Sequence, residues 1–315
     1  MSVPLVLQTE DLSDHASAWL GSRCRLVRAD PSNRPAFEHS LADAHGLVVR
    51  TYTRVDPALL AGAPNLRVVG RAGVGLDNID VAACRGRGVE VVYTPDANGS
   101  AVTELVLAVI LDAYRPRLFL DHAPTPARWS QIRKDLTAPR QLEGSTLGVL
   151  GLGKVGSRVA RAGRALGMNV IYHDVREIPG PGHGVATPVS HDRLLAESDV
   201  LTVHVDGRSS NHGLIGAGEL ARLKHGVVLV NTSRGFVIDT PALARFLRDH
   251  PSASAVLDVH DPEPFDASYP LLGIPNAHLM PHIGAATARS HENMSWVVRD
   301  VWRVLSGLAP EFPAP

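Results

Sequence analysis

Short apolar runs alternate with helix-like segments along nearly the whole chain. Runs of this kind, bounded by polar or glycine-containing sequence, are typical of strands buried in a parallel sheet. They lie at residues 5–7, 25–27, 46–49, 66–69 and 89–92, and then at 147–150, 170–174, 200–203, 227–230, 254–257 and 278–280. The alternation predicts an α/β protein with two parallel sheets, the first of about five strands and the second of about six.

The order of these runs predicts two domains, both Rossmann- or flavodoxin-like. The last helical pattern, residues 286–305, follows the final run, and we expect it to cross back to the first sheet. The predicted domains are therefore residues 1–98 plus 285–315, and residues 99–284. Residues 100–111 are apolar nearly all round, which predicts a helix buried between domains or in a subunit interface. Residues 117–141 contain three prolines and are interpreted as an extended arm.

A glycine motif opens the second domain. Residues 151–156 read Gly-Leu-Gly-Lys-Val-Gly and lie between a predicted strand and a predicted helix. This context is typical of a dinucleotide site, in which glycines permit a tight turn and a close approach to a pyrophosphate at the helix N-terminus. Asp174 ends the next strand, where a carboxylate accepts hydrogen bonds from a ribose. The candidate phosphate contacts are Gly151, Gly153, Lys154, Val155 and Gly156.

Composition narrows the class of protein. The 315 residues carry a formal net charge of −1, so no basic field favours nucleic acid. Two cysteines suit a reducing compartment, and no apolar run approaches the length of a membrane span. The first residues lack the basic start of a signal peptide. We expect a cytoplasmic enzyme that binds neither nucleic acid nor membrane and holds no metal.

Four further segments accompany the glycine motif. They read Arg-Ala-Gly-Val-Gly-Leu-Asp-Asn-Ile-Asp at 71–80, Asn-Thr-Ser-Arg-Gly at 231–235, Leu-Asp-Val-His-Asp-Pro-Glu-Pro at 257–264 and Pro-His-Ile-Gly at 281–284. Together, over about residues 46–300, the five segments resemble the D-isomer-specific 2-hydroxyacid dehydrogenases. The resemblance implies an oxidoreductase acting on a small 2-hydroxyacid or 2-oxoacid, with an active cleft between a substrate domain, 1–98 plus 285–315, and an NAD-binding domain, 99–284.

The same resemblance implies roles for particular side chains. His282 is the proton donor and acceptor, Glu263 orients and charges its imidazole, and Arg234 binds the substrate carboxylate or polarises the C2 oxygen. The N–H groups of Val74 and Gly75 hold the carboxylate from the other domain. Taken singly, each residue also has an ordinary structural interpretation: a capping histidine, an exposed turn glutamate, a solvated arginine or a plain glycine turn.

The remaining cofactor contacts follow the family pattern too. Asp258 is placed near the nicotinamide carboxamide, and the backbone of Thr232 and Ser233 lines the cofactor. His204 matches a family residue near the adenosine, although strand-end packing explains it nearly as well. His260 stands where the family often has an aromatic residue, and we expect it to pack there.

Asp174 also bears on the choice between NAD and NADP. Its carboxylate repels a 2′-phosphate, which favours NAD, while Arg176 nearby softens that preference. Arg50 matches a family loop that faces the substrate and favours a second anionic group, unless it is merely a solvated loop cation.

The sequence departs from the family at residues 206–210 and in the arm, which indicates a divergent branch. The apolar helix and the arm predict a homodimer. Two alternatives remain. One is a formate or phosphite dehydrogenase-like relative, of which the glutamate at position 263 disfavours the formate enzymes, and the other is an NAD-sensing protein similar to corepressors of this fold.

Overall fold

A computed structural model describes residues 3–178 and 182–315. The chain divides into two compact units, each described by itself below. The first unit comprises residues 1–98 and 285–315, and the second comprises residues 99–284.

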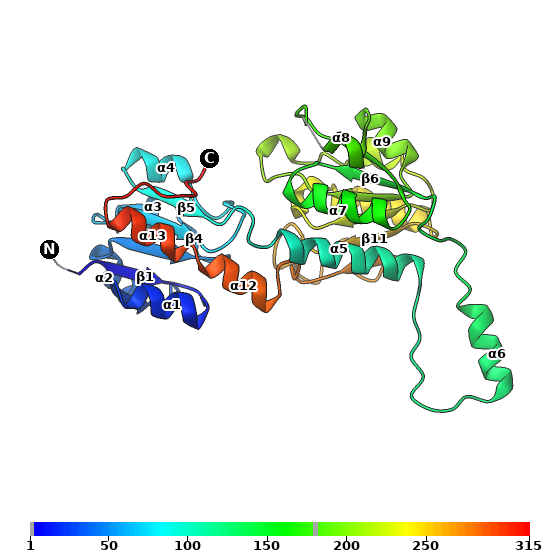
Figure 1. Cartoon of the computed structure of the whole chain (residues 1–315), viewed down its shortest axis with the longest axis horizontal. Coiled ribbons are helices and arrows are strands. Elements are labelled where there is room, and N and C mark those ends of the chain that lie inside the picture. Colours follow the sequence, from blue (N-terminus) through cyan, green and yellow to red (C-terminus); the bar gives the residue numbers. More distant parts are fainter. Residues whose placement is uncertain (1–2, 179–181) are drawn as a thin grey trace. The chain divides into compact units, whose positions relative to one another are not determined.

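The first unit is built on a five-stranded parallel sheet (Figure 1). The strands lie in the order β2-β1-β3-β4-β5, which is the order of flavodoxin-like sheets. Their bounds are β1 Leu5–Gln8, β2 Arg25–Arg28, β3 Gly46–Val49, β4 Val68–Arg71 and β5 Glu90–Tyr93. Because every pairing is parallel, all the strands end at the same edge of the sheet.

The C-terminal residues complete the first unit, as the sequence predicts. The helices of this unit are α1 Asp14–Gly21, α2 Arg34–Ala42, α3 Pro57–Ala61, α4 Val81–Gly86, α12 Ala288–Ser295 and α13 Val298–Leu305. The single expected helix over 286–305 is two helices, because Trp296 and Val297 bond three residues back instead of four. Helix α13 packs so closely on β4 that a Cβ added at Gly70 would lie 2.5 Å from Val301.

The second unit has a seven-stranded parallel sheet in the order β12-β11-β10-β9-β6-β7-β8. The bounds are β6 Thr146–Leu150, β7 Asn169–His173, β8 Thr187–Pro188, β9 Val200–Val203, β10 Val228–Asn231, β11 Ser254–Leu257 and β12 Ala277–Leu279. The prediction of six strands missed β8, whose two residues include a proline and make no hydrophobic pattern. The order reverses between β6 and β9, which is where doubly wound sheets bind ligands at the carboxyl ends of their strands.

Helices cover both faces of this sheet (Figure 1). The helices of the second unit, including α6 in the arm described below, are α5 Gly99–Tyr114, α6 Pro126–Asp135, α7 Lys154–Ala165, α8 Gly182–Val185, α9 His191–Glu197, α10 Ala217–Leu220 and α11 Thr240–Asp249, with short 3₁₀ turns η1 Ser209–Asn211 and η2 Gly235–Val237. Helix α5 packs one face against α7 and β10, so the apolar segment predicted as buried is buried on that face. Within the described residues, no helix has the length and apolarity to cross a bilayer.

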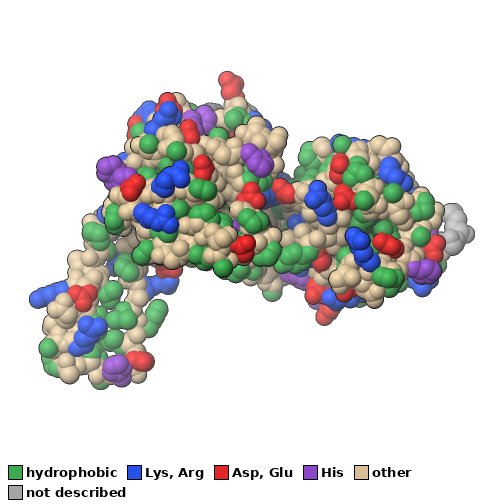
Figure 2. Space-filling model, turned by 180° about the vertical axis from the view of Figure 1, so that it is seen from behind, with side chains coloured by type: hydrophobic (Ala, Val, Ile, Leu, Met, Phe, Trp, Pro, Cys, Tyr) green, Lys and Arg blue, Asp and Glu red, His purple; other side chains and the backbone are tan. Residues whose placement is uncertain are grey.

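An arm, residues 115–141, projects from the second unit (Figure 1). It is extended as predicted, but it also contains α6, which begins at the capping residue Thr125 and Pro126 and buries none of its side chains. Apolar side chains show among the charged ones over the arm (Figure 2). Phe119 is 83% exposed and Trp129 is 51% exposed, so this segment carries apolar surface that the described chain does not cover.

Candidate active site and dinucleotide site

The glycine turn joins β6 to α7 through two close backbone approaches. Gly151 has φ +91°, and a Cβ there would lie 2.8 Å from the carbonyl oxygen of His204. A Cβ at Gly156 would lie 2.1 Å from the carbonyl oxygen of Gly151, so only glycine lets the helix start against the turn. A Cβ at Gly153 would meet nothing within 4 Å, which leaves open space at the N-terminus of α7. This cradle fits the pyrophosphate of a dinucleotide, with Lys154 and Val155 in the first helical turn.

Asp174 is tied to that turn. Its Oδ2 accepts from the backbone N–H of Leu152 at 2.9 Å, and its Oδ1 accepts from the backbone N–H and Nε of Arg176 at 2.9 and 3.1 Å. Burial raises the pKa of Asp174, but the hydrogen bonds and charge of Arg176 outweigh it and hold the pKa below its usual value. The carboxylate is therefore ionised and lies against the glycine turn.

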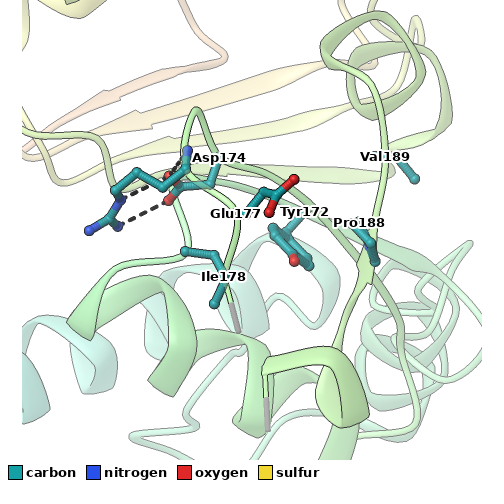
Figure 3. Close-up of a pocket in the computed structure, with 7 residues that line it drawn as sticks. Tyr172, Asp174, Glu177, Ile178, Pro188 and Val189 are labelled. Atoms are coloured by element: carbon teal, nitrogen blue, oxygen red, sulfur yellow. Dashed lines mark hydrogen bonds and ion pairs between the residues drawn. The ribbon is translucent and has the colours of Figure 1, made fainter. Parts of the chain in front are cut away.

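A cavity of about 590 Å³ opens beside Asp174 (Figure 3). Its lining includes Tyr172, Arg176, Ile178 and Pro188, so it lies along β7 and β8. The glycine turn follows β6, on the other side of β7. The cavity is therefore separated from the turn by β7, and Asp174 borders both.

His204 directly follows β9, with its ring inside the unit. Its Nε2 lies 2.8 Å from Oγ1 of Thr202, and burial lowers the pKa of His204 to about 3, so the ring is neutral. Its carbonyl packs against Gly151, as described above. The structure therefore puts His204 beside the turn, with its backbone against Gly151 and its ring packed inside the unit.

The turn after β10 is held by Asn231. Its Oδ1 accepts from the N–H and the hydroxyl of Ser233 at 3.0 and 2.9 Å, and its Nδ2 donates to the carbonyl of Arg234 at 2.9 Å. The hydroxyl of Ser233 thus serves the turn itself. Thr232 Oγ1 is buried without a hydrogen-bond partner in the described structure, which fits a ligand supplying one.

Asp258 directly follows β11 and is 1% exposed. Its two carboxylate oxygens accept from the N–H groups of Ile283 and Gly284, both at 2.7 Å. Burial raises its pKa, with those two hydrogen bonds acting in the opposite direction. The sequence reasoning missed this anchoring of the 282–284 loop, although an acid at the end of a strand was the available signal.

His282 lies in that loop with φ +56°, a left-handed conformation that is costly for a residue other than glycine. Its Nδ1 lies 2.8 Å from Oε2 of Glu263, whose Oε1 accepts from the N–H of His260 at 2.7 Å. The hydrogen bond that the imidazole donates to Glu263 raises the pKa of His282 above its usual value, against the effect of burial. For Glu263, burial raises the pKa, but the contact with His282 outweighs it and leaves the pKa lowered.

His260 supports this arrangement from behind. It is 6% exposed, its ring packs edge-on against Phe265 and Tyr269, and its Nε2 lies 2.8 Å from the carbonyl of Met280. The expected packing role is thus what the structure shows. In addition, its backbone N–H holds Glu263, a contact that sequence spacing alone did not reveal.

Arg234 lies three residues beyond β10, the neighbour of β11. Its charge acts on the imidazole of His282, lowering its pKa against the larger effect of Glu263. One of its guanidinium nitrogens donates to the carbonyl of Ser233 at 2.7 Å. The ends of β10, β11 and β12 therefore bring together an arginine fork, a carboxylate and a protonatable imidazole.

The remaining predicted residues lie in the first unit. Arg50 follows β3 and donates from Nη1 to the carbonyl of Asp11 at 3.0 Å. Val74 and Gly75 follow β4, the neighbour of β3, and both are half-buried. The structure thus places these three residues at one edge of the first sheet.

Comparison with known proteins agrees with this geometry. A family model described as D-isomer specific 2-hydroxyacid dehydrogenase, NAD binding domain, matches residues 107–284. The chain is 39% identical over 307 residues to D-3-phosphoglycerate dehydrogenase of Archaeoglobus fulgidus, covering 96% of this chain and 58% of that protein. It is 35% identical over 310 residues to glyoxylate reductase of Aeropyrum pernix, covering 95% of this chain and 92% of that one.

The fold has close solved counterparts. The crystal structure of a glyoxylate reductase from Paecilomyes thermophila matches with a TM-score of 0.85 and 31% identity, covering 100% of this chain and 99% of that one. The second unit, with its glycine cradle, is accordingly an NAD-binding domain. The chain belongs to the D-isomer-specific 2-hydroxyacid dehydrogenase family.

Proposed function

We propose that this chain transfers hydride between the nicotinamide of NAD and C2 of a D-2-hydroxyacid or 2-oxoacid. The observation that carries the proposal is the 2.8 Å contact between His282 and Glu263. This contact raises the pKa of His282, while the positive charge of Arg234 lowers it by a smaller amount. A protonatable imidazole, a carboxylate that orients it and a cation suited to a carboxylate are the groups that reduction of a 2-oxoacid requires.

In the direction of reduction, the bound nicotinamide supplies the hydride that C2 receives. His282 uses Nδ1 to contact Glu263, so Nε2 is the nitrogen that donates a proton to the C2 oxygen. The carbonyl thereby becomes a hydroxyl, and the imidazole is left neutral. In the direction of oxidation the same nitrogen takes the hydroxyl proton, and Glu263 stabilises the imidazolium that forms.

Substrate binding is assigned to three further groups. Arg234 holds the carboxylate and polarises the C2 oxygen through its fork of N–H donors. The N–H groups of Val74 and Gly75, in the first unit, bind the same carboxylate. The first unit is therefore proposed as the substrate domain.

The substrate remains open between two classes. The two curated relatives differ in their named substrates. Phosphoglycerate carries a phosphate besides its carboxylate, whereas glyoxylate has no second anionic group. Arg50 is the residue proposed to face that part of the substrate.

One experiment tests the proposed reaction. A panel of 2-oxoacids is offered with NADH, and nicotinamide absorbance is followed. We expect NADH oxidation with at least one member, a D-configured product, and no NAD reduction with formate. Lack of turnover with every 2-oxoacid would contradict the proposal and favour an NAD-sensing protein similar to the corepressors.

The preference for NAD over NADP is proposed to rest on Asp174. Asp174→Ala removes a charge-assisted hydrogen bond to the ribose, so NAD binding should weaken by about 1.5–3 kcal/mol and relative use of NADP should improve. Isothermal titration with each cofactor measures both effects. Asp192→Ala, at an exposed acid of the same unit, is the control. An unchanged NAD/NADP ratio in the Asp174 variant would remove Asp174 from the ribose site.

We also propose a homodimer that covers α5 and the arm. The support is the apolar surface of the arm, where Phe119 is 83% exposed. Light scattering at micromolar concentration should give about twice the 33.6 kDa of one chain. A stable species of single-chain mass would contradict it.

A cytoplasmic location is proposed as well. Cys24 and Cys84 are both free and buried, which suits a reducing compartment. Cell fractionation tests the location directly, and recovery of the protein in a membrane or secreted fraction would refute it.

A further inference from the structure

His260 of the second unit contacts both segments that carry the pair formed by His282 and Glu263. Its backbone N–H donates to Oε1 of Glu263 at 2.7 Å. Its ring nitrogen Nε2 lies 2.8 Å from the carbonyl oxygen of Met280, two residues before His282. One residue therefore holds the carboxylate through its backbone and the segment of the imidazole through its side chain.

The third proposed group is adjacent as well. Gly235, which directly follows Arg234, lies so close to His260 that an added Cβ would be 1.9 Å from its carbonyl carbon and 2.1 Å from its carbonyl oxygen. Only a glycine lets the turn after β10 approach the peptide of His260 in this way. The position of His260 therefore affects the segments of Arg234, Glu263 and His282 together.

The ring of His260 is oriented by a hydrogen bond on each nitrogen. A carbonyl can only accept, so Nε2 carries a proton and donates it to the carbonyl of Met280. In the neutral ring Nδ1 is then the acceptor, and it lies 3.1 Å from the hydroxyl of Tyr269, which is its donor. The imidazole thus links Tyr269 to the segment that leads into His282.

Packing alone does not call for an imidazole at this position. The ring centroid of His260 lies 4.7 Å from that of Phe265 and 5.4 Å from that of Tyr269, both edge-on, and a phenyl ring would make these contacts equally well. His260 and Tyr269 are each 6% exposed, so a phenyl would leave buried polar groups without their partners. The two ring nitrogens are therefore the part of His260 that packing does not explain.

We propose that the imidazole of His260 is a positioning residue for the catalytic pair, acting as a clamp between the Tyr269 hydroxyl and the Met280 carbonyl. The clamp fixes the segment of His282 relative to the turn that holds Glu263, and so keeps the two side chains in contact. This inference rests on the proposed reaction and adds to it a residue on which the alignment of the proton donor depends.

Two substitutions separate the clamp from packing. His260→Phe keeps a ring and loses both nitrogens, whereas His260→Gln packs less well but places a donor N–H near the position of Nε2. With a 2-oxoacid and NADH, the Phe variant should lose about tenfold in kcat and change KM by less than about twofold, because the proton donor is misaligned while substrate still binds. The Gln variant should recover most of this loss. A residue that only fills space predicts the reverse order.

The pH profile of reduction is a readout that a space-filling role would not move. Glu263 and Asp258 raise the pKa of His282, while burial and the charge of Arg234 lower it. A looser contact with Glu263 raises that pKa less. The alkaline limb should therefore move to lower pH in His260→Phe and return toward the parental position in His260→Gln.

Two further variants of the same cluster serve as checks. Tyr269→Phe removes only the hydroxyl that orients the ring, and should change kcat and the pH profile in the same direction by less. Phe265→Leu removes packing from the same ring and no hydrogen bond, so the melting temperature should fall while kcat and the profile stay parental. If His260→Phe does not fold, Tyr269→Phe takes its place under the same criteria.

Three results would overturn the proposal. They are a folded His260→Phe protein with the parental kcat and pH profile, a Gln variant less active than the Phe variant, and an equal loss of kcat in Phe265→Leu.

If the parent reduces no 2-oxoacid, the proposed reaction fails, and NMR titration of His282 then tests the clamp by itself. The imidazole signal is assigned by its loss in His282→Ala. It should titrate at lower pH in His260→Phe than in the parent, and near the parental value in His260→Gln. An unchanged titration in the Phe variant would overturn the assignment of His260.

Discussion

Asp258 in the second unit and Glu10 in the first each hold a loop through its backbone N–H groups, yet they leave opposite kinds of surface. Asp258 takes the two amides that follow His282, at 2.7 Å each, and leaves the imidazole side chain 45% exposed. Glu10 takes all four amides of its loop, residues 50–53. One carboxylate leaves a half-exposed imidazole beside its loop, and the other leaves no amide of its loop unpaired.

The difference comes from where each carboxylate enters its loop. Asp258 reaches the loop beyond the functional residue, so its bonds fix the left-handed turn at His282 while Glu263 remains free to pair with the ring. Glu10 enters at the centre of the curve, where it accepts from every amide of the 50–53 loop. Similar hydrogen-bond chemistry therefore anchors one side of the 282–284 loop and fills the whole of the other loop.

Among variants of the second unit, His282→Ala should have the largest effect on turnover. Loss of the proton donor should reduce turnover by roughly 10²–10⁴-fold at every pH, while NAD binding survives. Steady-state rates measure the loss of turnover, and cofactor titration measures NAD binding. His225→Ala, at an exposed histidine of the same unit, should be close to parental. Substantial activity in His282→Ala would mean that Asp258 anchors a loop without a catalytic function.

Arg234→Lys should cause the next largest loss of activity. An ammonium keeps the charge but cannot form two parallel hydrogen bonds with a carboxylate, so kcat/KM should fall by about 10²-fold while NAD affinity stays nearly intact. Single-turnover kinetics and cofactor titration separate the two effects. Near-normal turnover would remove Arg234 from the substrate site.

Asp258→Asn tests the anchor directly. The amide can accept one of the two hydrogen bonds but turns a donor toward the other N–H, leaving a buried group unsatisfied at a cost of about 1–3 kcal/mol. We expect a lower unfolding free energy and about tenfold slower turnover as His282 loses its alignment. Asp249→Asn, at the exposed end of α11, is the control. If stability falls without any change in turnover, the anchor matters for folding only.

The smallest effect at neutral pH should come from Glu263→Gln. Glu263 raises the pKa of His282, so the protonated form needed for reduction persists to higher pH and is lost as pH rises through that raised value. Removing the charge lowers the pKa, and the alkaline limb of the reduction profile should move to lower pH. A profile that superimposes on the parental one would show that the carboxylate does not tune the imidazole.

Residues in short motifs could be predicted from the sequence, whereas residues that act through long-range contacts could not. The glycine turn and Asp174 lie close together in sequence, and local spacing was enough to predict their neighbourhood. For Arg234, Glu263 and His282, the family resemblance carried by their motifs supplied the prediction. Strand β8 and helix α6 were missed, because two residues make no periodic pattern and a proline-rich segment conceals a helix of ten residues.

Glu10 was missed for a different reason. Its partners lie forty to forty-three residues away on another strand end, so only the pairing of β1 with β3 reveals them. The anchoring role of Asp258 is likewise a contact across twenty-five residues. Motifs report what is near in sequence, whereas these carboxylates act on loops brought to them by the sheet.

The return of α13 to the first unit has a consequence for synthesis on the ribosome. The second unit is continuous, so all its residues are available once residue 284 has emerged. The first unit must wait for Val301 to cover Gly70 and for Ala314 to bond Val91. The half of the protein made first is therefore the half completed last. In chains stalled at residue 284, protease should spare residues 99–284 and cut residues 1–98, and equal protection of both would contradict this order.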